Sequence, residues 1–230
     1  MAAETISEDD LTPAERRRRK VRDSIISAAE AIFAEDGEAG LSMRRIAERI
    51  DYSPAALYKY FDSKEALYRE IREQFFERLL GRMQQVCVDL QDGPLLCTKC
   101  MRAYVETGLE QPAHYKLAFG GVWDEADAPH EDSFAYAAAE HLHQMIEQSM
   151  AAGWFRKANL ELASNSVWAA SHGLTMLAVT VPDFPKEKFP GCVDDPALSL
   201  DAMIAFHAEM VMRGLGSDRL IERLNAGLKV

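Results

Sequence analysis

The 230-residue sequence lacks the usual features of a secreted protein. Its four cysteines, Cys87, Cys97, Cys100 and Cys192, are too few and too unevenly spaced for a disulfide framework. Residues 1–12 are acidic and lack the apolar segment of a signal peptide, so we expect a disordered tail and not a leader. A reducing cytoplasm is the simplest predicted location.

Residues 162–181, "LASNSVWAASHGLTMLAVTV", contain no charged side chain. Twenty residues approach the length of a membrane span, but six polar side chains within them, from Ser164 to Thr175, make a span a poor interpretation. A helix without charge on any side is typically surrounded by protein. We therefore predict that this segment packs against other helices and that the protein has no membrane partner.

Motifs of common enzymes and metal proteins are also missing. The sequence contains no Walker loop, nucleophile elbow or His-Glu-x-x-His motif, and no period-two strand pattern. Cys97 and Cys100 have the spacing of half a zinc site, but no second Cys or His pair follows at finger spacing. His141 and His143 would point to nearly opposite sides of a helix. We expect an all-α protein without metal or cofactor, and buried free cysteines.

Basic residues are scarce, because the net charge of −11 reflects 26 Lys and Arg against 37 Asp and Glu. That balance argues weakly against nucleic acid as a partner. Residues 1–62, however, hold 10 Lys and Arg against 13 Asp and Glu, with the run Arg16–Lys20 and further basic residues at Arg22, Arg44, Arg45, Arg49 and Lys59. An acidic body with a small basic head remains compatible with DNA binding.

Helix-start signals divide the first ninety residues into four helices. They are a capping box with proline at Thr12–Glu15, Ser42, Ser53 followed by Pro54, and a second capping box at Asp62–Glu65 that begins a helix to about Asp89. The segment "EDGEAG" ends the first helix. "QDGP" at residues 91–94 is the predicted boundary between a head, 13–75, and a body, 91–230. Nine or ten helices are expected, the later ones near 95–110, 112–119, 131–152, 160–180, 199–214 and 217–227.

The second and third helices are short and joined by a tight turn at Asp51, where a positive φ is often needed. This is the pattern of a helix-turn-helix, whose second helix lies in the DNA major groove. The small residues Ser53, Pro54, Ala55 and Ala56 permit close approach to base edges, and Tyr58, Lys59 and Tyr60 can reach phosphates. Helical hairpins with aromatics are also common in all-α cores, so the spacing alone leaves both interpretations open.

Residues 18–75 resemble the N-terminal domain of the tetracycline-repressor (TetR) family through "AAEAIFAEDG", "LSMRRIAERI", "LYKYF" and "DSKEAL". The resemblance implies phosphate contacts from Ser42, Tyr58, Tyr60 and Lys64. It implies base contacts from Ser53 to Ala56, with Arg44, Arg45 and Lys59 as further candidates. Asp51 and Tyr52 depart from the family pattern, which usually has glycine and a small aliphatic residue there. The run Arg16–Lys20 is either an arm that enters a groove or a solvated helix start.

In TetR-like proteins the body binds a small ligand and dimerises. "WAASHG" resembles the Trp-x-x-x-His-Gly signature of the WHG subclass, and small residues at helical spacing let a second helix approach. Together with the predicted helix that holds residues 200–211, this segment fits a four-helix bundle formed by two copies of the chain. The predicted interface is Ala169, Ala170, Gly173, Leu177, Met203, His207 and Met210. The predicted pocket for an apolar or aromatic effector is Tyr104, Phe119, Trp123, Phe134, Trp168, His172 and Met176.

The resemblance implies a dimeric, ligand-responsive repressor in the bacterial cytoplasm, associated with the nucleoid when bound. Its partners would be a palindromic double-stranded DNA operator and a small effector, and it would not be an enzyme. Two alternatives remain. One is an all-α ligand carrier or enzyme with a vestigial head, which would use His172, His141 or Cys100. The other is a DNA-binding scaffold that responds to no ligand.

Overall fold

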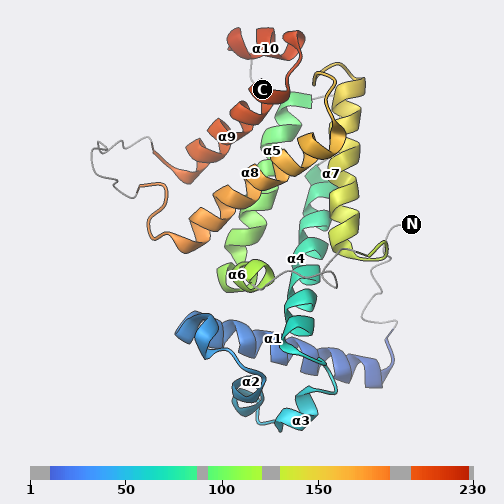
Figure 1. Cartoon of the computed structure of the whole chain (residues 1–230), viewed down its shortest axis with the longest axis vertical. Helices are drawn as coiled ribbons and strands as arrows, with labels where there is room; N and C mark the ends of the chain where they lie inside the picture. The colour runs from blue at the N-terminus through green and yellow to red at the C-terminus, as the bar shows by residue number, and fades with distance from the viewer. Residues whose placement is uncertain (1–10, 87–92, 121–129, 187–197, 228–230) are drawn as a thin grey trace. The chain divides into compact units, whose positions relative to one another are not determined.

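The computed structural model describes residues 11–86, 93–120, 130–186 and 198–227 (Figure 1). Within these ranges the chain forms ten α-helices and no β-strand, which confirms the predicted all-α class. The helices are α1 Pro13–Gly40, α2 Met43–Arg49, α3 Pro54–Leu57, α4 Lys64–Val86, α5 Gly93–Glu110, α6 Pro112–Gly120, α7 Phe134–Ala151, α8 Leu160–Thr180, α9 Leu200–Leu215 and α10 Asp218–Asn225.

The chain divides into two compact units. Unit 1 comprises residues 1–76 and 111–135, and unit 2 comprises residues 77–110 and 136–230. Helix α4 therefore contributes residues to both units, and α6 belongs to the same unit as α1, α2 and α3. These units differ from the predicted domains, 13–75 and 91–230, in the placement of residues 111–135.

Side-chain caps begin the first three helices at the predicted residues. Thr12 and Glu15 form the capping box, in which Thr12 N donates to Glu15 Oε2 at 2.7 Å. Ser42 Oγ accepts from Arg45 N at 3.3 Å, and Ser53 Oγ accepts from Ala56 N at 3.2 Å. These bonds satisfy amide donors that have no partner within the first turn of a helix.

Several helix starts differ from the sequence prediction by one to three residues. Helix α4 begins one residue later than expected, because Ser63 Oγ, and not Asp62, accepts from Ala66 N at 3.1 Å. Helix α5 already begins at Gly93, and α7 begins at Phe134, three residues after the predicted start. The segment "EDGEAG" ends α1 as predicted: Gly37 at φ 66° breaks the helix locally, and the last helical turn finishes at Gly40.

The core of unit 1 joins all of its helices. Its fully buried side chains include Ile25 and Ile32 of α1, Ile46 of α2 and Leu57 of α3. Edge-to-face contacts at 5.1 and 5.4 Å join Phe75 of α4 to Tyr115 and Phe119 of α6. This packing explains why α6, which is distant in sequence, groups with the first three helices.

Unit 2 is built around α5, which packs against α8 and α9. Its buried cluster includes Val105, Leu174, Ile204, Ala208 and Leu220, contributed by four helices. No helix in the described ranges is long and apolar enough to cross a membrane. The charge-free part of α8, which follows Glu161 in its first turn, packs against α5 and α9 on one side and exposes Leu162 and Leu177 on the other.

Candidate DNA-binding surface and effector region

The turn between α2 and α3 has the predicted geometry. Asp51 adopts φ 58°, in the left-handed region that aspartate tolerates better than most side chains. Tyr52 N donates to Ala47 O at 2.9 Å, which closes the turn. Ile46 and Leu57 are fully buried against each other's helices, so a small apolar core fixes α3 relative to α2.

Helix α3 presents small and polar residues outward. Ser53, Pro54, Ala55, Tyr58 and Lys59 are exposed, and Ala56, Tyr60 and Lys64 are half-buried. Leu57 and Phe61 point inward and are buried. The candidate base-contacting and phosphate-contacting residues of α3 are therefore accessible, while the two apolar residues of the same turn hold it in place.

The arginines of α2 are each paired with a carboxylate. Arg44 Nε lies 2.8 Å from Glu48, Arg45 Nη2 lies 2.5 Å from Asp36, and Arg49 makes two bonds of 2.6 and 2.7 Å to Glu35. The hydrogen bond with Arg49 lowers the pKa of the Glu35 carboxyl. The pairs of Arg45 and Arg49 were not predicted, because Asp36 and Glu35 lie on another helix. Any DNA contact by Arg45 would have to compete with Asp36.

Polar bonds also tie α6 to its neighbours in unit 1. The buried His114 places Nε2 2.9 Å from Ile71 O of α4, and its Nδ1 against the Glu30 carboxylate of α1. The guanidinium of Arg72 donates to Ala118 O at 2.9 Å. Glu73 accepts from Phe134 N at 2.6 Å, and burial raises the pKa of Glu73. Helix α6 is thus held by hydrogen bonds as well as by aromatic packing.

The predicted effector residues fall into two groups. In unit 2, Trp168 Nε1 donates to the Tyr104 hydroxyl at 3.2 Å, and that hydroxyl lies 3.4 Å from His172 Nδ1. Burial lowers the pKa of His172, which favours the neutral imidazole. Phe119 and Phe134 belong instead to unit 1, and Trp123 lies outside the described residues. The structure therefore joins three of the seven predicted residues by direct polar contacts.

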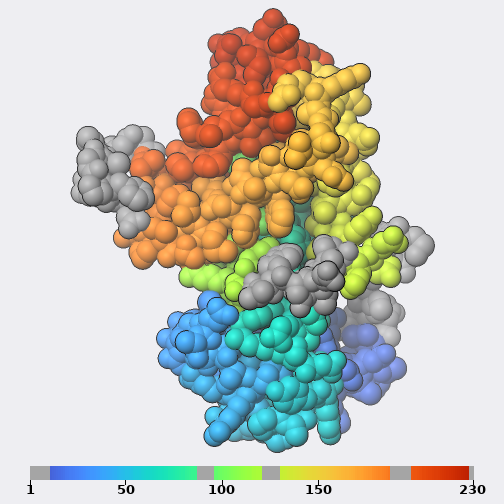
Figure 2. All heavy atoms as spheres, in the orientation of Figure 1, coloured from blue at the N-terminus to red at the C-terminus, as the bar shows by residue number. Residues whose placement is uncertain are grey.

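An open groove of about 550 Å³ runs between α8 and α9 in unit 2. Six of the seven predicted dimer residues line it, together with His172, Leu174, Met176 and Phe184; the six are Ala169, Ala170, Gly173, Leu177, Met203 and His207. A side chain added at Gly173 would meet open space, so nothing in the described part of this chain explains a glycine there by packing. In Figure 2, α8 and α9 lie beside each other in orange and red at the surface of this unit.

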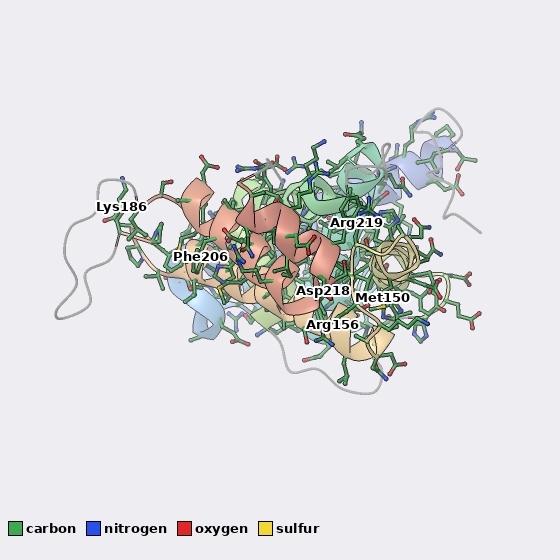
Figure 3. All side chains as sticks on the ribbon, turned by 90° about the horizontal axis from the view of Figure 1, so that it is seen from above. Met150, Arg156, Lys186, Phe206, Asp218 and Arg219 are labelled. Carbon is green, nitrogen blue, oxygen red and sulfur yellow. The ribbon has the colours of Figure 1, made fainter. Side chains whose placement is uncertain are left out.

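The seventh predicted dimer residue, Met210, and its neighbour Phe206 are large, apolar and exposed on α9. Figure 3 labels Phe206 among the side chains of unit 2. Together with exposed Leu162 and Leu177 of α8, they form an apolar surface that we call the α8–α9 face. This surface continues the lining of the groove, because Leu177 belongs to both.

Cys97 and Cys100 are free thiols. Burial raises the pKa of the Cys97 thiol to about 12, so it stays protonated at neutral pH and is a poor metal ligand. Among the residues that the structure describes, no three His, Cys, Asp or Glu side chains are grouped to hold a metal ion. Cys87 and Cys192 lie outside those residues.

Two family models match this chain. Residues 25–71 match the bacterial regulatory proteins of the tetR family, and residues 97–206 match the tetracyclin repressor-like C-terminal domain. The chain belongs to the TetR family. This confirms the predicted family, whose N-terminal model is described as one of bacterial regulatory proteins. The second model does not specify the WHG subclass, which stays a prediction.

Curated relatives of this TetR-family protein match parts of it. The transcriptional repressor KstR of Rhodococcus jostii RHA1 is 33% identical over 121 residues, covering 46% of this chain and 56% of KstR. The transcriptional regulator UidR of Escherichia coli K12 is 42% identical over 64 residues, covering 28% of this chain and 33% of UidR. The chain spans no more than 56% of the length of these relatives.

Solved structures are similar over most of the chain. A tetR-family regulatory protein from Rhodococcus RHA1 gives a TM-score of 0.61 at 21% identity, covering 86% of this chain and 97% of that one. RolR in complex with resorcinol gives a TM-score of 0.58 at 19% identity, covering 94% and 97%. At these identities the similarity establishes the fold.

Proposed function

We propose that this TetR-family protein is a homodimeric repressor that binds a palindromic DNA operator through α3 and is released by a small apolar or aromatic effector. The observation that carries the proposal is the outward face of α3. Small residues stand where a base edge would need close approach, and tyrosine and lysine side chains follow them. The protein would act in the bacterial cytoplasm, at the nucleoid when bound.

The α3 surface is suited to the two kinds of contact that DNA recognition requires. Ser53, Pro54 and Ala55 are exposed and small, so an α3 helix in the major groove can approach base edges closely. The exposed Tyr58 and Lys59 offer a hydroxyl and an ammonium group to phosphates, which fix the register of a protein on DNA. Ser42 and Lys64 are further phosphate candidates, on the starts of α2 and α4.

The α8–α9 face supports the homodimer. Four large apolar side chains are exposed on it, and their burial against a second copy would remove hydrocarbon from water. A two-fold dimer presents two α3 helices to two half-sites, about 34–36 Å apart or a multiple of that spacing. The operator would therefore be palindromic.

The Tyr104, Trp168 and His172 group supports an effector site in unit 2. It combines aromatic surface with a hydroxyl and an imidazole, which suits a mostly apolar ligand with a polar group. RolR was solved with resorcinol, and a neighbouring structure, KstR2 of Mycobacterium tuberculosis, is described as a ketosteroid regulator. Resorcinol, the ligand of RolR, is an aromatic compound with polar groups, which agrees with the effector proposed here.

Helix α4 is the proposed link between effector and DNA, because its residues belong to both units. A shift of the two α4 helices in a dimer would change the distance between the two α3 helices. That distance would then no longer equal the spacing of the two half-sites in the major groove. Ligand binding and DNA binding would then oppose each other, with a coupling of about 1–3 kcal/mol, or 5- to 150-fold in affinity.

The DNA part is tested by selecting duplexes from a random pool with the full-length protein. Enrichment of a palindrome supports the proposal, and no enrichment contradicts it. Ala55→Leu should abolish binding to the selected duplex without changing the fold, as measured by circular dichroism. Lys64→Ala should flatten the dependence of log affinity on log salt by about one unit. The exposed Lys157 of unit 2 is the matched control, and Lys157→Ala should leave that slope unchanged.

The effector part is tested by titrating resorcinol, other phenols and steroids into a fluorescently labelled operator complex. Release of the operator by a compound that also raises the melting temperature of the free protein supports repression lifted by a ligand. A compound that binds tightly and leaves operator affinity unchanged favours the ligand-carrier alternative. If operator binding is specific and no compound binds, the scaffold alternative is favoured.

A further inference from the structure

The recognition helix α3 is too short to hold its own conformation. It comprises one turn, Pro54–Leu57, and continues as a turn to Tyr60. Isolated helices of this length are unstable in water, because nucleation costs more than one turn of hydrogen bonds returns. The carbonyl groups at its C-terminal end also need hydrogen-bond donors from elsewhere. The orientation of α3 must therefore depend on neighbouring elements.

Arg22 of α1 provides such a partner through three contacts. Its Nη1 donates to Tyr60 O at 2.8 Å, at the end of the turn that follows α3. Its Nη2 lies 2.5 Å from the Glu70 carboxylate of α4. Its Cζ stacks 4.3 Å from the ring centroid of the buried Phe61. One guanidinium group thus joins α1, the end of α3 and α4.

A second arginine of α1 reinforces the same end of α3 more weakly. Arg18 Nη2 lies 3.4 Å from Lys59 O, and its Cζ lies 5.7 Å from the Tyr60 ring centroid. Arg18 and Arg22 are one helical turn apart on α1, so they face the same neighbour. The sequence analysis interpreted the run Arg16–Lys20 either as an arm that enters a groove or as a solvated helix start. Neither interpretation describes these contacts of Arg18, which are made with protein backbone and an aromatic ring.

We propose that Arg22 is a positioning residue for operator recognition: it sets the orientation of α3 and does not itself contact DNA. The inference rests on the proposed function of α3. Tyr60, whose carbonyl Arg22 holds, and its neighbours Lys59 and Tyr58 are candidate phosphate contacts, so a displaced turn would move them and the base-facing residues together. Only arginine offers planar, forked donors that bond a carbonyl and a carboxylate while stacking on a ring.

This role differs measurably from a phosphate contact. Arg22→Lys keeps the positive charge but loses the forked geometry, so counterion release on DNA binding should not change. Loss of position should instead weaken binding to the selected operator, where the exact placement of α3 matters, and leave binding to unrelated duplex as it was. Arg156→Lys is the matched control, because Arg156 is exposed, belongs to unit 2 and also bonds a backbone carbonyl.

The first experiment measures operator and unrelated-duplex affinity of the full-length protein across salt concentrations. We expect Arg22→Lys to weaken operator binding about tenfold, since bonds to a charged group contribute this much, with unrelated-duplex affinity and salt slope unchanged. Arg156→Lys should match the wild type. A parallel fall for both duplexes with a flatter slope would make Arg22 a phosphate contact and overturn the proposal. An unchanged operator affinity would overturn it as well.

The second experiment needs no DNA. Hydrogen exchange of the full-length protein, read on peptides that cover residues 54–61, should be faster in Arg22→Lys than in the wild type and in Arg156→Lys. Unchanged exchange there would overturn the positioning role, whatever the protein binds. If exchange is faster but the wild type selects no operator, the proposed function fails while the structural role of Arg22 stands.

Discussion

The two compact units differ in the large side chains that they expose. Among the described residues, the exposed large hydrophobic residues of unit 1 are Tyr52 and Tyr58, at 40% and 49%, and both carry a hydroxyl. In unit 2, Leu162, Phe206 and Met210 are exposed at 70%, 59% and 54%. A tyrosine hydroxyl can bond a phosphate, whereas a hydrocarbon side chain gains free energy only when another apolar surface covers it.

The units also differ in how their surfaces hold charge. In unit 1, the arginines of α2 and Arg22 of α1 are bonded to carboxylates of other elements or of the same helix. Unit 2 has such pairs too, as between Arg213 and Glu209, but its α8–α9 face exposes large apolar side chains. Under the proposed function, the unit 1 surface would meet DNA and the α8–α9 face would meet a second copy of the chain. Four changes would break or sharpen this comparison.

The largest effect is expected from a charge placed in the α8–α9 face. Phe206→Glu puts two carboxylates in a two-fold interface, and like charges brought together there cost several kcal/mol. We expect the dimer dissociation constant to rise at least about a hundredfold, measured by analytical ultracentrifugation. Ala205→Glu adds the same charge at an exposed position of α9, away from the large apolar side chains, and should leave the dimer intact. A dimer that survives Phe206→Glu would place the interface elsewhere.

The second change acts on the polar junction of α1 and α2 in unit 1. A side chain at Gly40 would collide with Asp36 and come within 2.8 Å of Arg45 Nη1, so Gly40→Ala should cost about 1–3 kcal/mol of unfolding free energy. Gly81 of α4, in unit 2, is the control, because a side chain there meets open space. Gly81→Ala should stabilise by about 0.5–1 kcal/mol through helix propensity. Urea unfolding measures the unfolding free energy of both variants. Equal values would contradict the close contact between a side chain at Gly40 and Asp36.

A smaller effect is expected from releasing an α2 arginine. Glu35→Gln removes the carboxylate that accepts two bonds from Arg49, so this cation becomes available to phosphates. Affinity for unrelated duplex DNA should rise severalfold, with a steeper salt dependence, while the melting temperature changes little. Glu38→Gln makes the same change of charge at an exposed position nearby. If both variants bind DNA equally, net charge alone explains the result and the pair has no specific effect.

The smallest effect concerns pH and unit 2. Burial lowers the pKa of His172 below its ordinary value of 6.5, so the folded chain binds fewer protons there than the unfolded chain. The contribution to stability is present above pH 6.5 and is lost as pH falls through the folded pKa. His172→Gln should therefore flatten the fall in unfolding free energy between neutral and mildly acidic pH. His130→Gln, at an exposed histidine, is the control. Identical pH profiles for wild type and His172→Gln would contradict the assignment.

Much of the fold was predictable because its signals are local. Thr12, Ser42 and Ser53 cap helices as predicted, since a capping side chain bonds an amide only two or three residues away. The positive φ of Asp51 also follows from the shortness of the turn between two periodic segments. The incorrect choice of Asp62 as the cap of α4 also comes from local signals, because Ser63 beside it is an equally good cap and packing decides between them.

The candidate sites were predictable only in part. The accessible face of α3 follows from the alternation of Leu57 and Phe61 with small and polar residues, and the apolar groove on α8 follows from its charge-free small residues. The effector residues were less predictable, because an aromatic in a core and an aromatic in a pocket look alike in sequence. Phe119 was expected beside Trp168, yet it packs on Phe75 of unit 1.

The sequence by itself determined where helices begin, which faces are apolar and which family the chain belongs to, because these depend on spacings of a few residues. Only the tertiary structure decided that His114 meets Glu30, 84 positions away, and that Arg22 reaches Tyr60 O, 38 positions away. No local pattern encodes such pairs, since a charged side chain can bond whatever partner the packing of the apolar faces brings within reach.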